Sequence, residues 1–200
     1  MITSLPNLLT LFRIAAIPGI VALFFLESNL GKYLACGLFA VAAITDFFDG
    51  YLARAYGQQS SFGQFLDPVA DKLLVASALL MATAFGQIGG MTLLPAVVIL
   101  CREILVSGLR EFLAGLQIGV PVSTLAKWKT MIQMFAIGFL IVGDSGPDAL
   151  PTRLIGELGL WAAAVLTLIT GYDYLRASLH HLTGETTLGP TSDSSARDDG

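Results

Sequence analysis

The sequence predicts an all-α integral membrane protein, and three observations support this fold class. Apolar residues make up 54% of the 200-residue chain, while charged residues make up only 13%. The mean hydropathy is +0.73. The charges are also clustered, which leaves long uncharged segments between them. Soluble domains carry about 25% charged residues, so we expect helices that cross a bilayer.

Six apolar segments follow one another along the chain and are the expected transmembrane helices. Four of them occupy residues 14–26, 33–45, 130–143 and 154–171. The other two share the longest uncharged run, between Lys72 and Arg102. A glycine-rich stretch at residues 86–90 divides this run, which predicts two helices joined by a tight turn.

Several of these segments are shorter than the ~20 residues that a membrane-spanning helix needs. We therefore expect the helices to extend into the charged segments beside them, which brings ionisable side chains to membrane depth. The first turns, around Pro6, are expected to lie along the membrane interface. Residues 1–182 should form one membrane domain, and residues 183–200 a disordered polar tail.

Lysine and arginine are distributed unevenly over the two ends of these spans. With six spans, only Lys32 and Arg153 fall on one side, and all the other basic residues fall on the opposite side. The positive-inside rule places the basic side in the cytoplasm. The sequence thus predicts a multi-pass protein with both termini facing the cytoplasm, together with the acidic segment at residues 46–71, the candidate active site.

Four carboxylates are the most informative polar groups of this apolar chain. Asp46 and Asp49 are three residues apart, and Asp67 and Asp71 are four apart. Each pair therefore projects from one face of a helix. Two such helices side by side would bring the four acids together, where carboxylates suit hard cations such as Mg²⁺ or Mn²⁺. The plainer alternative is that the acids cap helices or pair with the nearby bases Arg54 and Lys72.

The segment that contains these acids reads D-x-x-D-G-x-x-A-R, followed eight residues on by G-x3-D-x3-D. This pattern resembles the signature of the CDP-alcohol phosphotransferases, which are integral membrane enzymes that move a phosphatidyl group from a CDP-linked lipid to an alcohol. The resemblance implies two divalent cations, Mg²⁺ or Mn²⁺, bound by the four aspartates. It also implies that Asp71 is the catalytic base.

Small residues accompany the acids. Gly50, Ala53 and Gly63 lack bulk on the acid-bearing faces, which would let a nucleotide or pyrophosphate approach the backbone closely. Small residues also let membrane helices pack tightly, and both explanations stay open. The expected nucleotide- and lipid-binding residues are Asn7, Thr10, Gly50, Ala53, Arg54 and Gly63.

Three further segments look like bacterial members of the family that use glycerol 3-phosphate as the acceptor. They read P-N-L-L-T-L-F-R from residue 6, R-E-I-L-V-S-G-L-R-E from residue 102, and S-T-L-A-K-W-K-T-M-I-Q from residue 123. Their bases are expected to bind the acceptor phosphate: Arg102, Arg110, Lys127 and Lys129. Glu103 and Glu111 are expected to pair with these bases. The alternative role of the bases is to snorkel toward lipid headgroups.

The implied reaction transfers the phosphatidyl group of CDP-diacylglycerol to glycerol 3-phosphate and releases CMP, in a homodimer of the bacterial inner membrane. No basic surface suggests nucleic acid as a partner. Within the family, the alternative acceptors are serine, inositol phosphate and phosphatidylglycerol. Outside it, a membrane prenyltransferase would also use aspartates and Mg²⁺ on a pyrophosphate. An ion transporter would also bury acids.

Overall fold

The structure, a computed structural model, describes residues 5–56, 61–117 and 124–185. Within these ranges, it describes only the backbone of residues 5–7, 46–56, 61–62, 64–65, 124 and 180–185. The α-helices are α1 (Leu5–Phe24), α2 (Asn29–Tyr56), α3 (Ser61–Ala84), α4 (Leu93–Gly115), α5 (Thr124–Val142) and α6 (Thr152–Glu185). Short 3₁₀ helices, Gly90–Thr92 and Gly143–Ser145, precede α4 and follow α5. The described ranges contain no β-strand, which confirms the all-α prediction.

The helices extend into the charged segments, as predicted. Helix α2 continues beyond its apolar part to Tyr56, and α3 begins at Ser61, ahead of the acids Asp67 and Asp71. Pro6 lies in the first turn of α1, where its missing N–H costs no hydrogen bond. In the described part of the chain, three segments are long and apolar enough to cross a membrane: Gly90–Gly115, Leu125–Ser145 and Thr152–Leu179.

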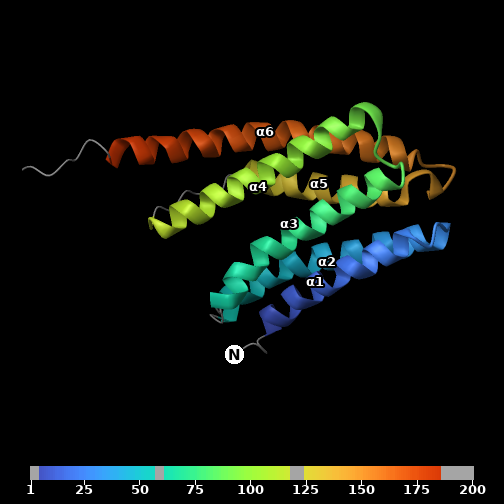
Figure 1. Ribbon diagram of the computed structural model, residues 1–200, viewed down its shortest axis with the longest axis horizontal. Coiled ribbons are helices and arrows are strands. Elements are labelled where there is room, and N and C mark those ends of the chain that lie inside the picture. The colour runs from blue at the N-terminus through green and yellow to red at the C-terminus, as the bar shows by residue number, and fades with distance from the viewer. Residues whose placement is uncertain (1–4, 57–60, 118–123, 186–200) are drawn as a thin grey trace, which may run out of the picture.

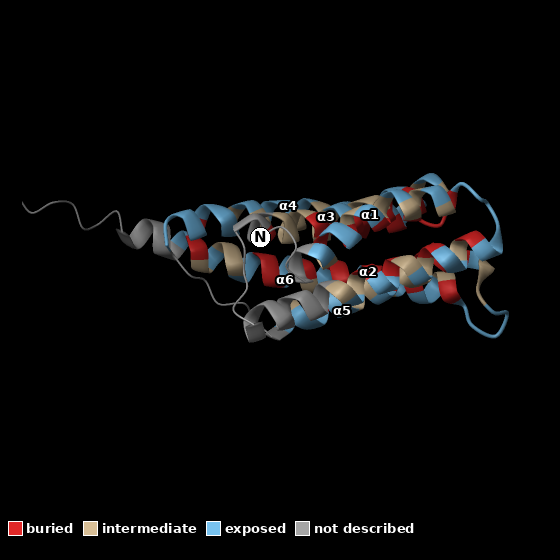
Figure 2. Ribbon diagram, turned by 90° about the horizontal axis from the view of Figure 1, so that it is seen from below, coloured by how far each residue is buried: buried red, intermediate tan, exposed pale blue. Residues whose placement is uncertain are grey.

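The helices form two layers, with α1, α3 and α4 in one and α2, α5 and α6 in the other (Figure 2). Helix α5 packs along α6, α1 packs along both α2 and α3, and α4 packs along α6. Many of the most buried core residues are alanines, including Ala35, Ala42, Ala78, Ala82 and Ala163. Small side chains at these contacts let the helix backbones approach closely, as is usual in membrane bundles.

Successive helices run in alternating directions (Figure 1). The starts of α1, α3 and α5 therefore lie toward the same end of the bundle as the ends of α2, α4 and α6. This is the end toward which the predicted acids of α2 and α3 lie along their helices. The opposite end carries the turn between α3 and α4 and the connection between α5 and α6.

The predicted glycine-rich turn joins α3 to α4. Gly86 has a φ of 76° and Gly90 a φ of 54°, conformations in which a Cβ would be strained. The Gln87 N–H donates to the Ala82 carbonyl at 2.8 Å, which satisfies a carbonyl at the end of α3. The chain can therefore reverse within a few residues.

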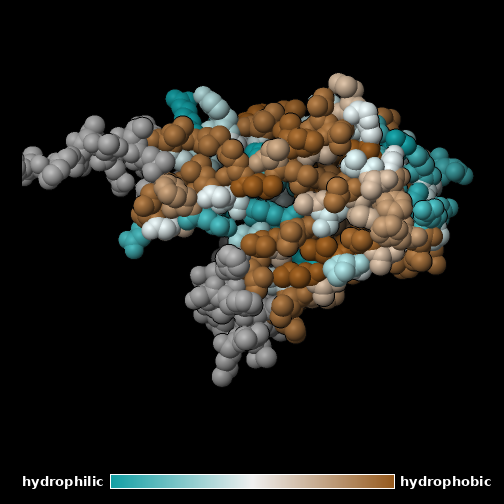
Figure 3. Space-filling model, viewed as in Figure 1, coloured by the Kyte–Doolittle hydropathy of each residue, from teal (hydrophilic) through white to brown (hydrophobic). Residues whose placement is uncertain are grey.

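Hydrophobic residues cover much of the face shown in Figure 3. Hydrophilic residues gather at the end that carries the turn between α3 and α4, and in a band across the middle. Several large apolar side chains are exposed, with Leu80 at 68%, Phe135 at 65% and Leu158 at 62%. Such a surface is unfavourable in water and suits contact with lipid.

Candidate active site

Helix α3 presents Asp67 and Asp71 one turn apart, as predicted. The Thr10 hydroxyl, which α1 supplies, donates a hydrogen bond to Asp67 Oδ1. Pro68 follows Asp67, and its carbonyl accepts a hydrogen bond from Lys72 Nζ at 2.7 Å. Contacts from α1 and within α3 therefore fix the helix turn that carries both acids.

Asp71 keeps an oxygen available. Its Oδ1 atom is buried and has no hydrogen-bond partner in the part of the chain that the structure describes. A buried carboxylate oxygen without a partner is costly, so it marks a place where a proton, a donor or a cation belongs. The chemistry of Asp67 and Asp71 fits a hard divalent cation, because such ions prefer carboxylate oxygens.

The other predicted acids belong to α2, which contacts α3. The side chains of Asp46 and Asp49, and those of Gly50, Ala53 and Arg54, lie outside the described residues, as does the side chain of Asn7. The described side chains include no group of three or more His, Cys, Asp or Glu residues that could hold a metal. The four-aspartate site therefore stays a prediction. Gly63, at the start of α3, is buried.

Positive charge surrounds Asp71. Arg13 from α1, Lys72 from α3 and Lys129 from α5 all interact electrostatically with its carboxylate. Arg13 is fully buried and Lys129 is 3% exposed. This end of the apolar bundle therefore concentrates cationic groups from three helices, an arrangement that attracts an anionic ligand.

The predicted pairing of Glu103 with the bases is confirmed. Lys129 Nζ forms a charge-assisted hydrogen bond with Glu103 Oε1, which joins α5 to α4. Arg102 Nη1 lies 3.9 Å from the same Glu103 oxygen. Because Glu103 serves two cations, the cluster of Arg102, Glu103 and Lys129 carries a net positive charge.

Arg102 also contacts helix α6, through Thr170 and Gly171. Arg102 Nη2 donates to Thr170 Oγ1 at 3.0 Å, and the Thr170 hydroxyl in turn donates to the Leu166 carbonyl at 2.8 Å. A Cβ added at Gly171 would lie 3.1 Å from Arg102 Cγ and Nε, so the side chain rests directly on the glycine. Arg102 Nε is buried beside Gly171 and has no hydrogen-bond partner among the described residues.

The two remaining predicted bases are more exposed. Arg110 lies two turns beyond Arg102 on α4, with its guanidinium 5.8 Å from the centre of the Tyr174 ring. This distance fits a cation–π contact. Lys127 is exposed at the start of α5. The structure thus gathers Arg102 and Lys129 around Glu103, while Arg110 and Lys127 lie outside this cluster.

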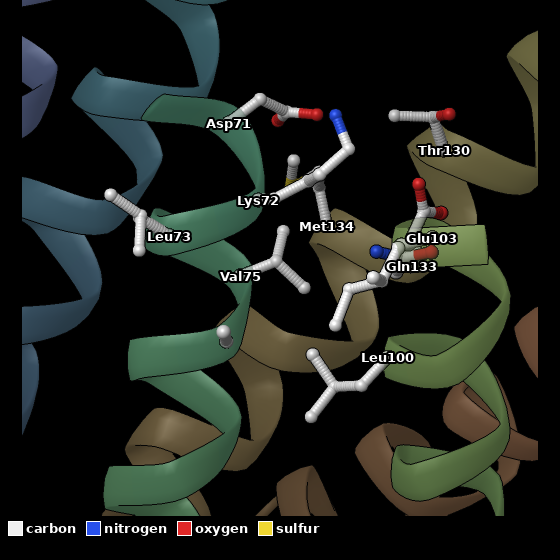
Figure 4. A pocket seen from close by; sticks show the side chains of 11 residues that line it. Asp71, Lys72, Leu73, Val75, Leu100, Glu103, Thr130, Gln133 and Met134 are labelled. Atoms are coloured by element: carbon white, nitrogen blue, oxygen red, sulfur yellow. The ribbon is translucent and has the colours of Figure 1, made fainter. Parts of the chain in front are cut away.

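A pocket of about 170 Å³ opens between α3, α4 and α5 (Figure 4). Asp71, Lys72, Glu103, Thr130 and Gln133 supply its polar groups. The other lining residues are Leu73, Val75, Ala76, Leu100, Ile104 and Met134. The predicted base and the Glu103 carboxylate therefore border one cavity, which has an apolar floor.

Sequence analysis gave no role to Gln133, Thr170 or Tyr174. The structure brings each to the site, since Gln133 lines the pocket, Thr170 binds Arg102 and Tyr174 contacts Arg110. The sequence feature that could have indicated these residues is their spacing along the helices. Thr170 and Tyr174 are four residues apart, and Gln133 follows Lys129 by four, so each polar residue recurs on one face of an apolar helix.

An all-helical fold, apolar outer surfaces and a cationic site beside partly buried acids are typical of membrane enzymes that act on anionic substrates. The family model described as CDP-alcohol phosphatidyltransferase matches residues 3–169. The chain therefore belongs to the CDP-alcohol phosphatidyltransferase family, and the predicted family resemblance is confirmed.

Similar proteins cover nearly the whole chain. A CDP-diacylglycerol--glycerol-3-phosphate 3-phosphatidyltransferase of Rickettsia bellii is 52% identical, covering 87% of this chain and 94% of the relative. One of Cereibacter sphaeroides is 40% identical, covering 91% of this chain and 98% of the relative. The crystal structure of Mycobacterium tuberculosis phosphatidylinositol phosphate synthase in apo form is similar with a TM-score of 0.61. It is 21% identical, over 88% of this chain and 89% of that one, and so supports the fold alone.

Proposed function

We propose that the protein transfers the phosphatidyl group of CDP-diacylglycerol to glycerol 3-phosphate, giving phosphatidylglycerophosphate and CMP. The observation that carries this proposal is that Asp71, a partly buried acid with a buried unpartnered oxygen, interacts with Lys129, which belongs to a cationic cluster with Arg102. The names of relatives up to 52% identical support the same acceptor. Family membership argues against the prenyltransferase and transporter alternatives.

The acceptor phosphate would bind at the cluster of Arg102, Glu103 and Lys129. Arg102 and Lys129 share the single Glu103 carboxylate, and the resulting net positive charge of the cluster favours a dianionic phosphate. Arg110 and Lys127 are more exposed, so we assign them to drawing the anion toward the site. Serine lacks a phosphate for these cations and should be a poor acceptor.

Asp71 would take the proton of the reacting hydroxyl. As that O–H bond breaks, the hydroxyl oxygen forms a bond to the lipid-linked phosphorus, and the bond from this phosphorus to the CMP oxygen breaks. CMP leaves with the electron pair. Asp71 is suited to the proton transfer because it borders the pocket and has an unpartnered oxygen.

Asp46, Asp49, Asp67 and Asp71 are the proposed ligands of two divalent cations, Mg²⁺ or Mn²⁺. When bound, these ions would neutralise the pyrophosphate and stabilise charge on the departing phosphate. The hydrogen bond from Thr10 to Asp67 orients one of the acids. Asn7, Gly50, Ala53, Arg54 and Gly63 complete the proposed nucleotide and lipid site.

The proposed setting is the bacterial inner membrane, with six spans, cytoplasmic termini and a homodimeric assembly. The alternating helix directions support this topology, because the acid-bearing ends of α2 and α3 lie toward the same end of the bundle as the start of α1 and the end of α6 (Figure 1). The apolar helix surfaces support contact with lipid and with a second copy.

Purified protein in detergent micelles with CDP-diacylglycerol tests the function. CMP release and phosphatidylglycerophosphate formation should require glycerol 3-phosphate, and Asp71→Asn should abolish both. Equal rates with serine, inositol phosphate or phosphatidylglycerol would overturn the acceptor assignment. CMP release by the Asp71→Asn variant at the wild-type rate would remove Asp71 from the mechanism.

A further inference from the structure

Gln133 is a buried polar residue with no assigned role in the proposed reaction. It is 2% exposed, and its Oε1 atom has no hydrogen-bond partner within the described parts of the chain. Leaving such an acceptor unpaired in an apolar bundle is costly. Gln133 nevertheless lines the pocket that Asp71 borders, where a ligand can supply the missing donor (Figure 4).

The other polar groups of the pocket are already engaged. Glu103 binds Lys129, and Lys72 donates to the Pro68 carbonyl. The Thr130 hydroxyl donates to the Ala126 carbonyl at 3.0 Å. Among the described lining residues, the buried acceptor atoms left without a partner are Asp71 Oδ1 and Gln133 Oε1. The pocket therefore suits a ligand that brings two hydroxyl donors.

The register of α5 places Gln133 relative to the acceptor phosphate. Lys129 and Gln133 are four residues apart on one helix face, a rise of about 6 Å. A three-carbon phosphate ester has a comparable length. A phosphate beside Lys129 would therefore leave the carbon chain within reach of Gln133.

We propose that Gln133 Oε1 accepts a hydrogen bond from the secondary hydroxyl of glycerol 3-phosphate, the hydroxyl that does not react. This inference rests on the proposed function. The reacting primary hydroxyl goes to Asp71, the phosphate to Arg102 and Lys129, and the middle hydroxyl to Gln133. Gln133 is thereby a specificity-determining residue that selects acceptors with a hydroxyl next to the reacting carbon.

The test compares glycerol 3-phosphate with 3-hydroxypropyl phosphate, which keeps the phosphate and the reacting hydroxyl but lacks the secondary hydroxyl. Wild-type protein should prefer glycerol 3-phosphate by about 5 to 150-fold in kcat/KM, the effect of one unsatisfied buried acceptor. Gln133→Leu should reduce this preference to within about 3-fold. The KM for CDP-diacylglycerol should stay unchanged.

Two further proteins keep the result interpretable. Gln133→Met preserves the length of the side chain without its acceptor and should give the same loss of preference. Met131→Leu, at an exposed position of the same helix, should retain the wild-type preference.

The outcomes separate this inference from the proposed function. If the wild-type protein forms no product from glycerol 3-phosphate, the proposed function fails. If it uses both acceptors equally well, the role of Gln133 is overturned even without a variant. The role is also overturned if either Gln133 variant keeps the full preference.

Discussion

Arg102 on α4 and Thr170 on α6 are joined by a hydrogen bond of 3.0 Å between the guanidinium Nη2 and the hydroxyl oxygen. The Thr170 hydroxyl is itself oriented by donating to the Leu166 carbonyl. Thr170 therefore fixes the direction of the Arg102 side chain. Helix α6, which carries none of the predicted site residues, thus orients a base proposed to bind the acceptor.

Thr170→Val should weaken acceptor binding and leave lipid binding intact. Valine keeps the shape of threonine but removes the hydroxyl that holds Arg102, so we expect the KM for glycerol 3-phosphate to rise by about 10-fold. The KM for CDP-diacylglycerol should not change. Initial rates at varied concentrations of each substrate provide the measurement.

Thr167→Val is the matched control for this substitution. Thr167 lies on the same helix and is fully buried, but its hydroxyl has no hydrogen-bond partner in the described ranges. Removing that hydroxyl should leave both KM values near wild type. Equal effects of the two substitutions would contradict a positioning role for Thr170.

Gly171→Ala should displace Arg102 without destabilising the protein. The added methyl group would lie 3.1 Å from Arg102 Cγ and Nε, so the side chain must move. We expect kcat/KM for glycerol 3-phosphate to fall by about 10-fold, while the thermal midpoint stays the same or rises because alanine favours helix. Gly37→Ala, which has open space around its Cβ, is the control and should keep full activity. A fully active Gly171→Ala enzyme would contradict this packing argument.

The sequence alone could predict the helical class, the tight turn at residues 86–90 and the pairing of Glu103, because these follow from apolar segments, glycine pattern and local charge. It could not predict the bond between Arg102 and Thr170. These residues are 68 positions apart, and their contact depends on how α4 packs against α6. The extension of the helices into the charged segments could also be predicted, because the apolar runs are too short to span a bilayer.

The role of Gln133 was hidden for a different reason. A glutamine in an apolar helix has many possible partners, and only the fold shows that its oxygen lacks one and borders the pocket beside Asp71. Spacing placed Gln133 on the face of Lys129. The proposed hydrogen bond from Gln133 to a ligand could be inferred only once the cavity between α3, α4 and α5 was known.

Removing the divalent cations should stop turnover while leaving the protein folded. EDTA should abolish CMP release, and added Mg²⁺ or Mn²⁺ should restore it. Asp67→Asn should lower turnover by about 100-fold or more, because it weakens a proposed metal ligand that Thr10 also orients. Thr10→Val should cost less, about 10-fold. Full activity of Asp67→Asn in the presence of EDTA would eliminate the metal mechanism.

The proposed topology places Met1 and Gly200 in the cytoplasm and the turn at residues 86–90 outside. Single cysteines at these three positions, in a cysteine-free background made by replacing Cys36 and Cys101, should differ in labelling by a membrane-impermeant reagent. In intact cells whose outer membrane has been permeabilised, only the turn should react. Labelling of the Gly200 position under the same conditions would rule out six spans with cytoplasmic termini.

Glu103→Gln should destabilise the protein, because it removes the acid that partners a buried lysine. The side chains of Lys129 and Glu103 are 4% and 19% exposed, so Lys129 would keep a poorly solvated charge. Breaking such a pair costs about 3 to 5 kcal/mol of unfolding free energy. Glu103→Leu combined with Lys129→Met removes both charges and should recover most of this loss.

In the double variant, Glu103→Leu with Lys129→Met, the catalytic activity should not recover together with the unfolding free energy. The double variant lacks the Lys129 cation proposed to bind the acceptor phosphate, so its kcat/KM for glycerol 3-phosphate should stay at least about 10-fold below wild type. Unfolding in detergent micelles and CMP release, measured on the same preparations, separate the two effects. A double variant that is stable and fully active would show that Lys129 serves only to neutralise Glu103, and the phosphate would then depend on Arg102 alone within this cluster.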